Sequence, residues 1–474
     1  MKRSFSVFLL LVLLLSAAVS CNPVGKRPVT TETGDTAPAE TRDPNYDPTK
    51  VFGIRSAHYS FDNAAMTYLF NYHYGYFVAN YYSYLSYFGL DITKPLKDQS
   101  SPDEGVSWFD YFMTDAVNSA KSMLALCEAA EEFGVQWDEN DEAYLLGLSD
   151  EIREAALSTP EVTPDKYIKA TFGEDASFDA VLEVNRLSHL AGKVSDALYE
   201  SLEATDAEIE AYYEENKSRY LLLPYYAYSF SKRTLTGEEL SALKEKAEAA
   251  AAASHDPDSF YEAVKPYIEE EGETYSLSYL YNEIGFGGTS DAEVWLWDEA
   301  RKPGDATVID SDATYTVLLY CDGPKRDDSR TASVRHILLD GSDDETKAQA
   351  EAILAEFLTD PTAEHFTELA GKYTTDPGFQ TVGDLYADLR EGDTVQAFNN
   401  WTFDPARKHG DTGIVLSEYG YHIMYFEDFG EYLWRQEARE AILDQKADEK
   451  MVPYFDAVTT DDAILSLVLP YIAE

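Results

Sequence analysis

The sequence predicts a multidomain α+β protein, in which a mainly helical region precedes two related α+β domains. Its 474 residues suit two to four domains at roughly 100–200 residues each. Amphipathic patterns dominate the first half of the chain, and a later segment repeats an earlier one without a gap. The formal charge of −50, from 37 basic and 87 acidic residues, argues against nucleic-acid binding, which needs basic patches.

The first 21 residues are typical of an export signal. Two basic residues precede the apolar run 7–15, and small residues follow up to Cys21. The run is shorter than the about 20 apolar residues that span a membrane. Residues 18–21 resemble the bacterial lipobox, which implies cleavage before Cys21 and a lipid anchor on it; a plain secretory signal is the alternative. Residues 22–50, rich in Pro, Thr, Asp and Glu, predict a disordered tether.

The remaining cysteines, Cys127 and Cys321, do not form a disulfide framework. Export permits them to pair, but two buried free thiols are the favoured interpretation. No Cys/His spacing typical of a metal site occurs, and we expect no cofactor.

Residues 51–220 are predicted to form one mainly helical domain. The stretch 58–91 contains 13 aromatic residues and no proline, which favours one long helix. Two interpretations of these rings stay open, a core and a groove for unfolded polypeptides. Further helices are expected at 108–134, 140–157 and 177–203, and Thr205 and Glu208 have capping-box spacing at the start of another.

An internal repeat marks two related domains. A shift of 106 residues places 295–315 on 401–421, with nine identities in 21 positions. Each copy has a strand, helices, a Gly-Asp turn and a closing strand, an α+β pattern. We call residues 221–327 copy one and residues 328–430 copy two.

Copy two resembles the parvulin family of peptidyl-prolyl isomerases. The resemblance is carried by five motifs in the family's order, namely R-H-I-L at 335–338, Y-T-T-D at 373–376, G-D-L at 383–385, V-Q-A-F at 395–398 and G-Y-H-I-M at 420–424. It implies an isomerase site made of catalytic and substrate-binding residues. The catalytic set is His336, Asp376, Ser417 and His422; the substrate-binding set is Leu385, Val395, Gln396 and Phe398.

Three positions in copy two depart from the family pattern. Val395 stands where Met or Leu is usual, Ser417 where Thr is common, and Tyr386 replaces the Gly that follows G-D-L. We expect Tyr386 to crowd the mouth of the pocket. Copy one departs further, because the repeat aligns Thr316 with His422 and, approximately, Phe230 with His336. The resemblance therefore implies a degenerate parvulin-like fold for copy one.

The required chemistry explains these residue types. Rotation about an X–Pro bond meets a barrier of ~20 kcal/mol, because amide resonance must be broken. An apolar cup for the proline ring, with a hydrogen-bonded chain of His336, His422, Asp376 and Ser417 behind it, favours the twisted amide over both planar states.

The order of the whole chain resembles PrsA- and SurA-type foldases, with a closing helix at 433–454 that is expected to pack on the helical domain. The resemblance implies an extracytoplasmic, lipid-anchored foldase that binds unfolded exported polypeptides and isomerises X–Pro bonds. A holdase chaperone without isomerase activity is the alternative, and a solute-binding lipoprotein is a third possibility that explains the repeat poorly.

Overall fold

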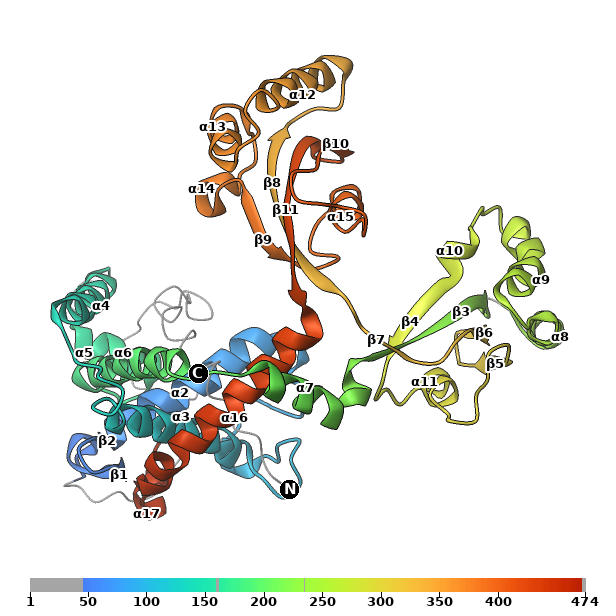
Figure 1. Cartoon of the computed structure of the whole chain (residues 1–474). Helices are drawn as coiled ribbons and strands as arrows, with labels where there is room; N and C mark the ends of the chain where they lie inside the picture. The colour runs from blue at the N-terminus through green and yellow to red at the C-terminus, as the bar shows by residue number, and fades with distance from the viewer. Residues whose placement is uncertain (1–45, 159–161, 234, 471–474) are drawn as a thin grey trace. The chain divides into compact units, whose positions relative to one another are not determined.

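The computed structural model describes residues 46–158, 162–233 and 235–470. The predicted export signal, Cys21 and most of the tether thus lie outside the described residues. Contacts divide the chain into two compact units, one of residues 1–203 and 443–474 and one of residues 204–442 (Figure 1). Among the described residues, no helix is both long and apolar enough to cross a membrane.

The first unit is mainly helical, with a small antiparallel sheet in the strand order β12-β1-β2. Its helices are α2 (Asn63–Tyr81), α3 (Trp108–Glu128), α4 (Glu139–Leu157), α5 (Pro164–Phe172), α6 (Phe178–Glu200), the end of α16 (Leu433–Ala457) and α17 (Asp462–Leu465). Its strands are β1 (Phe52–Arg55), β2 (Ser60–Asp62) and β12 (Thr459–Thr460). Three expected helices are therefore present, with α3 and α6 ending before the expected residues.

The single helix expected over 58–91 is wrong. Strand β2 occupies the beginning of this stretch, and Asp62 caps α2 by accepting a hydrogen bond from the backbone of Ala65. Helix α2 ends at Tyr81, and the short 3-10 turn Tyr82–Tyr84 follows. No change in aromatic composition marks the first break, because aromatic residues continue through it.

The aromatic stretch is divided between core and surface. Tyr68, Phe70 and Tyr74 are at most 7% exposed and belong to the core of the first unit. After the end of α2 the side chains reach solvent: Tyr82 and Tyr84 are about 60% exposed and Tyr87 is 85% exposed. The core interpretation is therefore confirmed for the first part of the stretch, and the groove for unfolded polypeptides stays a prediction for the exposed part.

The second unit contains copy one, copy two and a small apolar cluster. The strands of copy one are β3 (Leu221–Ser231), β4 (Tyr281–Gly285), β5 (Ala306–Asp310), β6 (Thr314–Tyr320) and β7 (Lys325–Arg326); its helices are α8 (Glu238–Ala253), α9 (Pro257–Glu270), α10 (Leu277–Leu280) and α11 (Asp291–Leu296). The strands of copy two are β8 (Arg330–Leu339), β9 (Leu385–Leu389), β10 (Thr412–Ser417) and β11 (Gly420–Tyr432); its helices are α12 (Asp344–Phe357), α13 (Ala363–Tyr373), α14 (Phe379–Val382) and α15 (Gln396–Thr402).

Both copies have one strand topology. Copy two has the order β10-β11-β8-β9, and copy one has the corresponding order β5-β6-β3-β4, with β7 pairing separately with β3. All strand pairs are antiparallel. In copy two, buried residues of α12 and α13 pack on one face of the sheet with Ile337, Leu339 and Ile423. The opposite face carries a second apolar cluster that includes Phe398 of α15.

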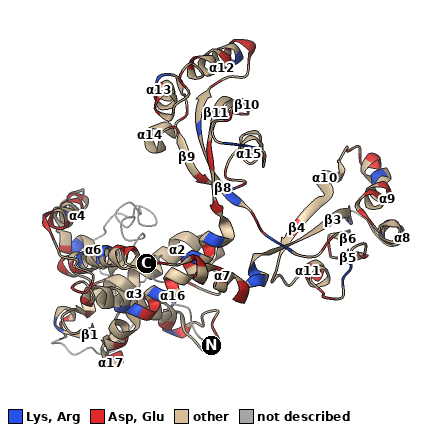
Figure 2. Ribbon diagram, viewed as in Figure 1, with Lys and Arg blue, Asp and Glu red and all other residues tan. Residues whose placement is uncertain are grey.

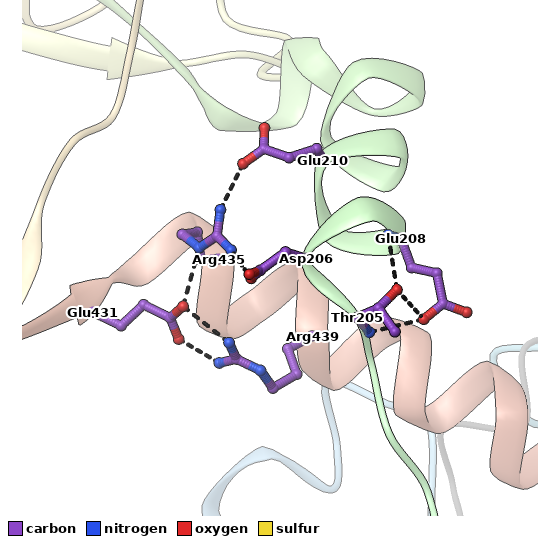
Figure 3. Close-up of polar contacts among 7 residues, drawn as sticks. All are labelled: Thr205, Asp206, Glu208, Glu210, Glu431, Arg435 and Arg439. Carbon is purple, nitrogen blue, oxygen red and sulfur yellow. Dashed lines mark hydrogen bonds and ion pairs between the residues drawn. The ribbon is translucent and has the colours of Figure 1, made fainter.

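The small apolar cluster joins α7 (Asp206–Glu215) to the first turns of α16. Ile209 and Tyr213 of α7 pack against Trp434, and the guanidinium group of Arg435 forms ion pairs with Asp206, Glu210 and Glu431 (Figure 3). The expected capping box is present, because the side chain of Glu208 accepts from the backbone of Thr205 at 2.8 Å. These contacts assign α7 to the second unit, whereas the sequence placed residues up to 220 with the helical domain.

Acidic side chains are distributed over both units. Figure 2 shows them on α4 of the first unit and on α9 and α12 of the second. Cys127 and Cys321 are free thiols; Cys127 is buried and Cys321 is half-buried.

Candidate functional site

The two central strands of copy two carry the two histidines. Within the β8–β11 ladder, Met424 pairs with His336, and His422 pairs with Leu338. The histidines are therefore two positions apart in register and lie on the same face of the sheet, because side chains alternate along a strand. Each imidazole is 5% exposed, and their Nδ1 atoms are 3.4 Å apart.

Burial determines the charge state of these imidazoles. It lowers the pKa of His336 and lowers that of His422 to about 4, and the neighbouring His336 lowers the latter further. Both rings are consequently neutral at pH 7. A neutral imidazole has one N–H and one acceptor nitrogen, so the Nδ1–Nδ1 contact requires one ring to donate and the other to accept.

The polar groups at either end of the pair define a chain of contacts. Ser417 Oγ lies 2.7 Å from His422 Nε2, and Asp376 Oδ2 lies 3.2 Å from His336 Nε2. Because a carboxylate only accepts, His336 carries its proton on Nε2, accepts from His422 at Nδ1, and leaves His422 Nε2 to accept from Ser417. The structure thus brings together the four residues predicted as catalytic.

An apolar cluster covers the histidine pair. The ring of Phe398 packs edge to face on both imidazoles, at centroid distances of 5.3 Å from His336 and 5.4 Å from His422. Phe398 is 3% exposed, and Val395 packs in the same cluster. This wall of aromatic and aliphatic carbon beside a polar chain is an environment that suits a proline ring next to an amide carbonyl.

Two of the residues predicted to bind substrate lie elsewhere. Gln396 is exposed at the first position of α15. Leu385 is half-buried and pairs with Arg335, whereas the next residue, Tyr386, pairs with Val334 and joins the Phe398 cluster. Because neighbouring strand residues point to opposite faces, Tyr386 and not Leu385 lines the site.

Tyr386 makes a contact that the sequence did not predict. Its hydroxyl group donates to Asp376 Oδ2 at 2.8 Å, and its ring packs on His336 at a centroid distance of 4.6 Å. Gly378 makes this approach possible, since a Cβ there would lie 2.7 Å from the Tyr386 hydroxyl oxygen. The departure from the family pattern therefore belongs to the polar chain.

An ion pair next to His336 was also missed. Arg335 Nη1 lies 3.0 Å from Asp384 Oδ2, and Arg335 Nε contacts Glu427. Asp384 is 4% exposed, and its carbonyl group accepts from the backbone of His336 at 3.0 Å. The pair fixes β9 on β8 beside the site. The sequence contained a signal for this ion pair, since Arg335 and Asp384 are charged residues within otherwise apolar strand motifs.

Comparisons with known proteins identify the fold of this segment. Residues 319–428 match the sequence model of the PPIC-type PPIase domain family. Copy two is a parvulin-type domain. Foldase protein PrsA 1 of two Listeria monocytogenes strains is 34% identical over 92 residues, which are 19% of this chain and 29% of the relative. The chain thus spans about a third of the length of these curated relatives.

Solved structures of foldases are similar to longer parts of the chain. The PrsA peptidylprolyl isomerase of Bacillus anthracis aligns with 60% of this chain and all of its own, at 14% identity and a TM-score of 0.20. A Campylobacter jejuni structure described as a SurA-like chaperone aligns with 73% of this chain and 94% of its own, at 13% identity and a TM-score of 0.20.

Copy one has the same fold without the polar chain. Leu318 is the counterpart of Met424 at the shift of 106, and it pairs with Ala227, as Met424 pairs with His336. Ala227 therefore takes the place of His336, and the alignment of Phe230 with His336 was wrong. A gap of three residues, which the repeat at the other end did not reveal, caused the error. Thr316 takes the place of His422, as expected.

Proposed function

We propose that the chain is an extracytoplasmic, lipid-anchored foldase that binds unfolded exported polypeptides and isomerises X–Pro bonds at copy two. The observation that carries the proposal is the contact of Phe398 with both neutral imidazoles on a buried face. A proline ring placed against this face has its carbonyl next to groups that donate and accept hydrogen bonds. No bond has to break, so the site needs no strong nucleophile.

Catalysis at this site is differential binding. The planar cis and trans amides are both conjugated, and the twisted amide is not, so its nitrogen becomes pyramidal and more basic. A rigid wall that holds the ring while the polar chain adapts to the moving carbonyl stabilises the twisted form more than the planar forms. His336, His422 and Asp376 supply that polar chain, with Ser417 at its end.

A protease-coupled assay tests this proposal. The full-length chain is expected to accelerate cis-to-trans conversion of an X–Pro peptide in proportion to its concentration, and replacement of His336 and His422 together by glutamine is expected to remove most of the acceleration. A folded wild-type chain without acceleration would favour the holdase alternative. The hydroxyl group of Tyr386, which occupies one oxygen of Asp376, is the observation in favour of that alternative.

The exposed tyrosines that follow α2 are the surface we propose for unfolded polypeptides. Tyr82, Tyr84 and Tyr87 offer large aromatic area and a polar tip that tolerates water. Their replacement by serine is expected to weaken suppression of client aggregation at an unchanged melting temperature. Tyr419 of copy two, which is 60% exposed, provides a control: its replacement by serine should leave suppression intact. A fall in melting temperature with the triple change would contradict a surface role.

The anchor rests on the sequence around Cys21. Cys21→Ala is expected to abolish lipid modification and to move the protein from the membrane fraction to the medium. A variant that stays membrane-bound and unprocessed would contradict the lipobox interpretation.

A further inference from the structure

Two donors share one oxygen in the candidate site. Asp376 Oδ2 accepts from the hydroxyl group of Tyr386 at 2.8 Å, and it also lies 3.2 Å from His336 Nε2. The bond from Tyr386 is well formed. The contact of His336 is weaker: Nε2 lies within ion-pair distance of Oδ2 but forms no well-aligned hydrogen bond among the described residues. His336 is thus a buried donor with an acceptor nearby that is already occupied.

The remaining contacts of Asp376 hold it in this position. Its Oδ1 accepts from the backbone of Gly378 at 3.1 Å, so the carboxylate cannot turn freely toward His336. The ring of Tyr386 also packs edge to face on His336, at a centroid distance of 4.6 Å. The arrangement departs from the family pattern, which has glycine where Tyr386 stands.

We propose that Tyr386 is a positioning residue whose hydroxyl group occupies Asp376 Oδ2 and so prevents a full hydrogen bond between Asp376 and His336. This role deepens the proposed function, on which its consequence for isomerisation rests. Without the hydroxyl group, Oδ2 has no competing donor and accepts a full hydrogen bond from His336 Nε2, which already lies 3.2 Å away. A carboxylate at hydrogen-bond distance favours the imidazolium form, which puts a charge where the twisted amide requires a neutral donor–acceptor chain.

The surroundings of His336 support this direction. The titratable groups that face it among the described residues are Asp376, Asp384, Tyr386 and His422, and Phe398 covers the remaining side. Asp384 is engaged by Arg335. Asp376 is therefore the acid whose contact can change, and Tyr386 is the residue that controls it. The pKa of Tyr386 is raised to about 12 by burial first and by Asp376 second, so its hydroxyl group keeps its proton across the physiological range.

Titration of His336 by NMR in the full-length chain tests the proposal without depending on activity. In Tyr386→Phe, which keeps the ring and removes the hydroxyl group, the pKa of His336 is expected to rise by about one unit or more. Where peptide isomerisation is measurable, the acid limb of kcat/KM should shift upward with it, and kcat at pH 6 should fall more than KM changes. Tyr421→Phe, on the helix-covered face of the same sheet, is the matched control and should shift neither.

Two further variants make the outcome unambiguous. In an Asp376→Asn background, Tyr386→Phe should add no shift of the His336 pKa, because the coupling passes through the carboxylate. Tyr386→Gly, which restores the residue of the family pattern, separates positioning from crowding. An unchanged His336 titration in folded Tyr386→Phe would overturn the proposal, and so would a faster Tyr386→Gly beside a Tyr386→Phe identical to wild type. Absence of isomerase activity in the wild type would overturn the proposed function, while the titration would still decide the role of Tyr386.

Discussion

Copy one and copy two have the same scaffold and different chemistry. The backbone hydrogen bonds of the corner that joins the last helix to the closing strands repeat in the two copies. The backbone of Gly304 donates to Tyr320, as that of Gly410 donates to Phe426, both at 2.9 Å. The two glycines have φ of 94° and 86°, a region that disfavours other residues. Most identities between the copies therefore mark the scaffold, and the alignment of Ser311 with Ser417 is the exception.

The site face differs at three positions that carry chemistry, although Ser311 of copy one aligns with Ser417. Copy one has Ala227, Thr316 and Ala292 at the counterparts of His336, His422 and Phe398. Its face is filled by apolar residues, among them Leu296 and Leu318. Buried imidazoles beside a carboxylate stabilise a fold less than apolar packing does, since polar groups lose hydration on burial. Copy two retains this arrangement, which is typical of a functional site.

The largest expected effect comes from Phe398, the ring that contacts both imidazoles. Phe398→Ala should lower kcat/KM for an X–Pro peptide by at least about 100-fold and cost about 3–5 kcal/mol of stability, the usual cost of truncating a buried ring. Phe398→Leu, which restores most of the apolar volume, should recover stability more than activity. A protease-coupled assay and thermal unfolding measure the two quantities.

Copy one supplies the control for this truncation. Leu296 is 1% exposed in the corresponding cluster. Leu296→Ala should destabilise copy one and leave isomerase activity unchanged. An equal loss of activity in both variants would show that the assay reports folding of the chain and that copy two is not the active domain.

Acid should destabilise copy two more than copy one. Burial lowers the pKa of His422 to about 4 in the folded chain from an ordinary value of about 6.5, so the unfolded chain binds more protons between these pH values. The free energy of unfolding therefore decreases as pH falls from 6.5 to 4, by on the order of 3 kcal/mol, and His336 acts in the same direction. Above pH 6.5 this penalty is absent.

Local amide hydrogen exchange distinguishes the two copies in this experiment. After correction for intrinsic rates, protection of β11 should fall with pH across this window while protection of β6 stays constant, because the strands of copy one contain no histidine. A global measurement would not suffice, since burial also lowers the pKa of His73 in the first unit to about 4. Parallel loss of protection in β6 and β11 would contradict the assignment of this acid sensitivity to the buried histidines of copy two.

Exchange of single residues between the copies gives a smaller effect. His422→Thr, which introduces the residue of copy one, should lower kcat/KM about tenfold, since one lost hydrogen bond costs ~1–1.5 kcal/mol. Thr316→Ala in copy one removes the hydroxyl group that contacts Ser229 and should have no effect on activity. A tenfold loss with Thr316→Ala would place part of the activity in copy one.

Sequence reasoning predicted the scaffold better than the details of the site. Motif order was sufficient to identify the parvulin-type domain, and the repeat identified a second copy. The four residues predicted as catalytic, His336, Asp376, Ser417 and His422, meet in space, because each residue is fixed by a strand or turn motif. Leu385 lies on the opposite face from the histidine pair, because one position of strand register decides which face a side chain occupies.

Other features depended on contacts between distant segments. The bond of Tyr386 to Asp376 joins β9 to the loop after α13, and no local pattern encodes it. The assignment of α7 to the second unit follows from Trp434, more than 200 residues away. The break before α2 was missed because burial, not composition, separates β2 from the helix.

The smallest expected difference lies within the repeated corner itself. Arg407 Nε donates to the carbonyl group of Trp401 at 3.0 Å and its guanidinium lies 4.1 Å from the ring centroid. In copy one Arg301 lies 5.0 Å from the Trp295 centroid, and its buried Nε makes no hydrogen bond within the described chain. Lysine cannot reproduce either the bond or the flat stacking. Arg407→Lys should therefore cost copy two about 1 kcal/mol, and Arg301→Lys should cost copy one only ~0.3 kcal/mol. Amide exchange protection of β10 and β5 measures the two stability costs, and isomerase activity should be unchanged in both variants. Equal or reversed costs would contradict the link between the different contacts of the two corners and their stability.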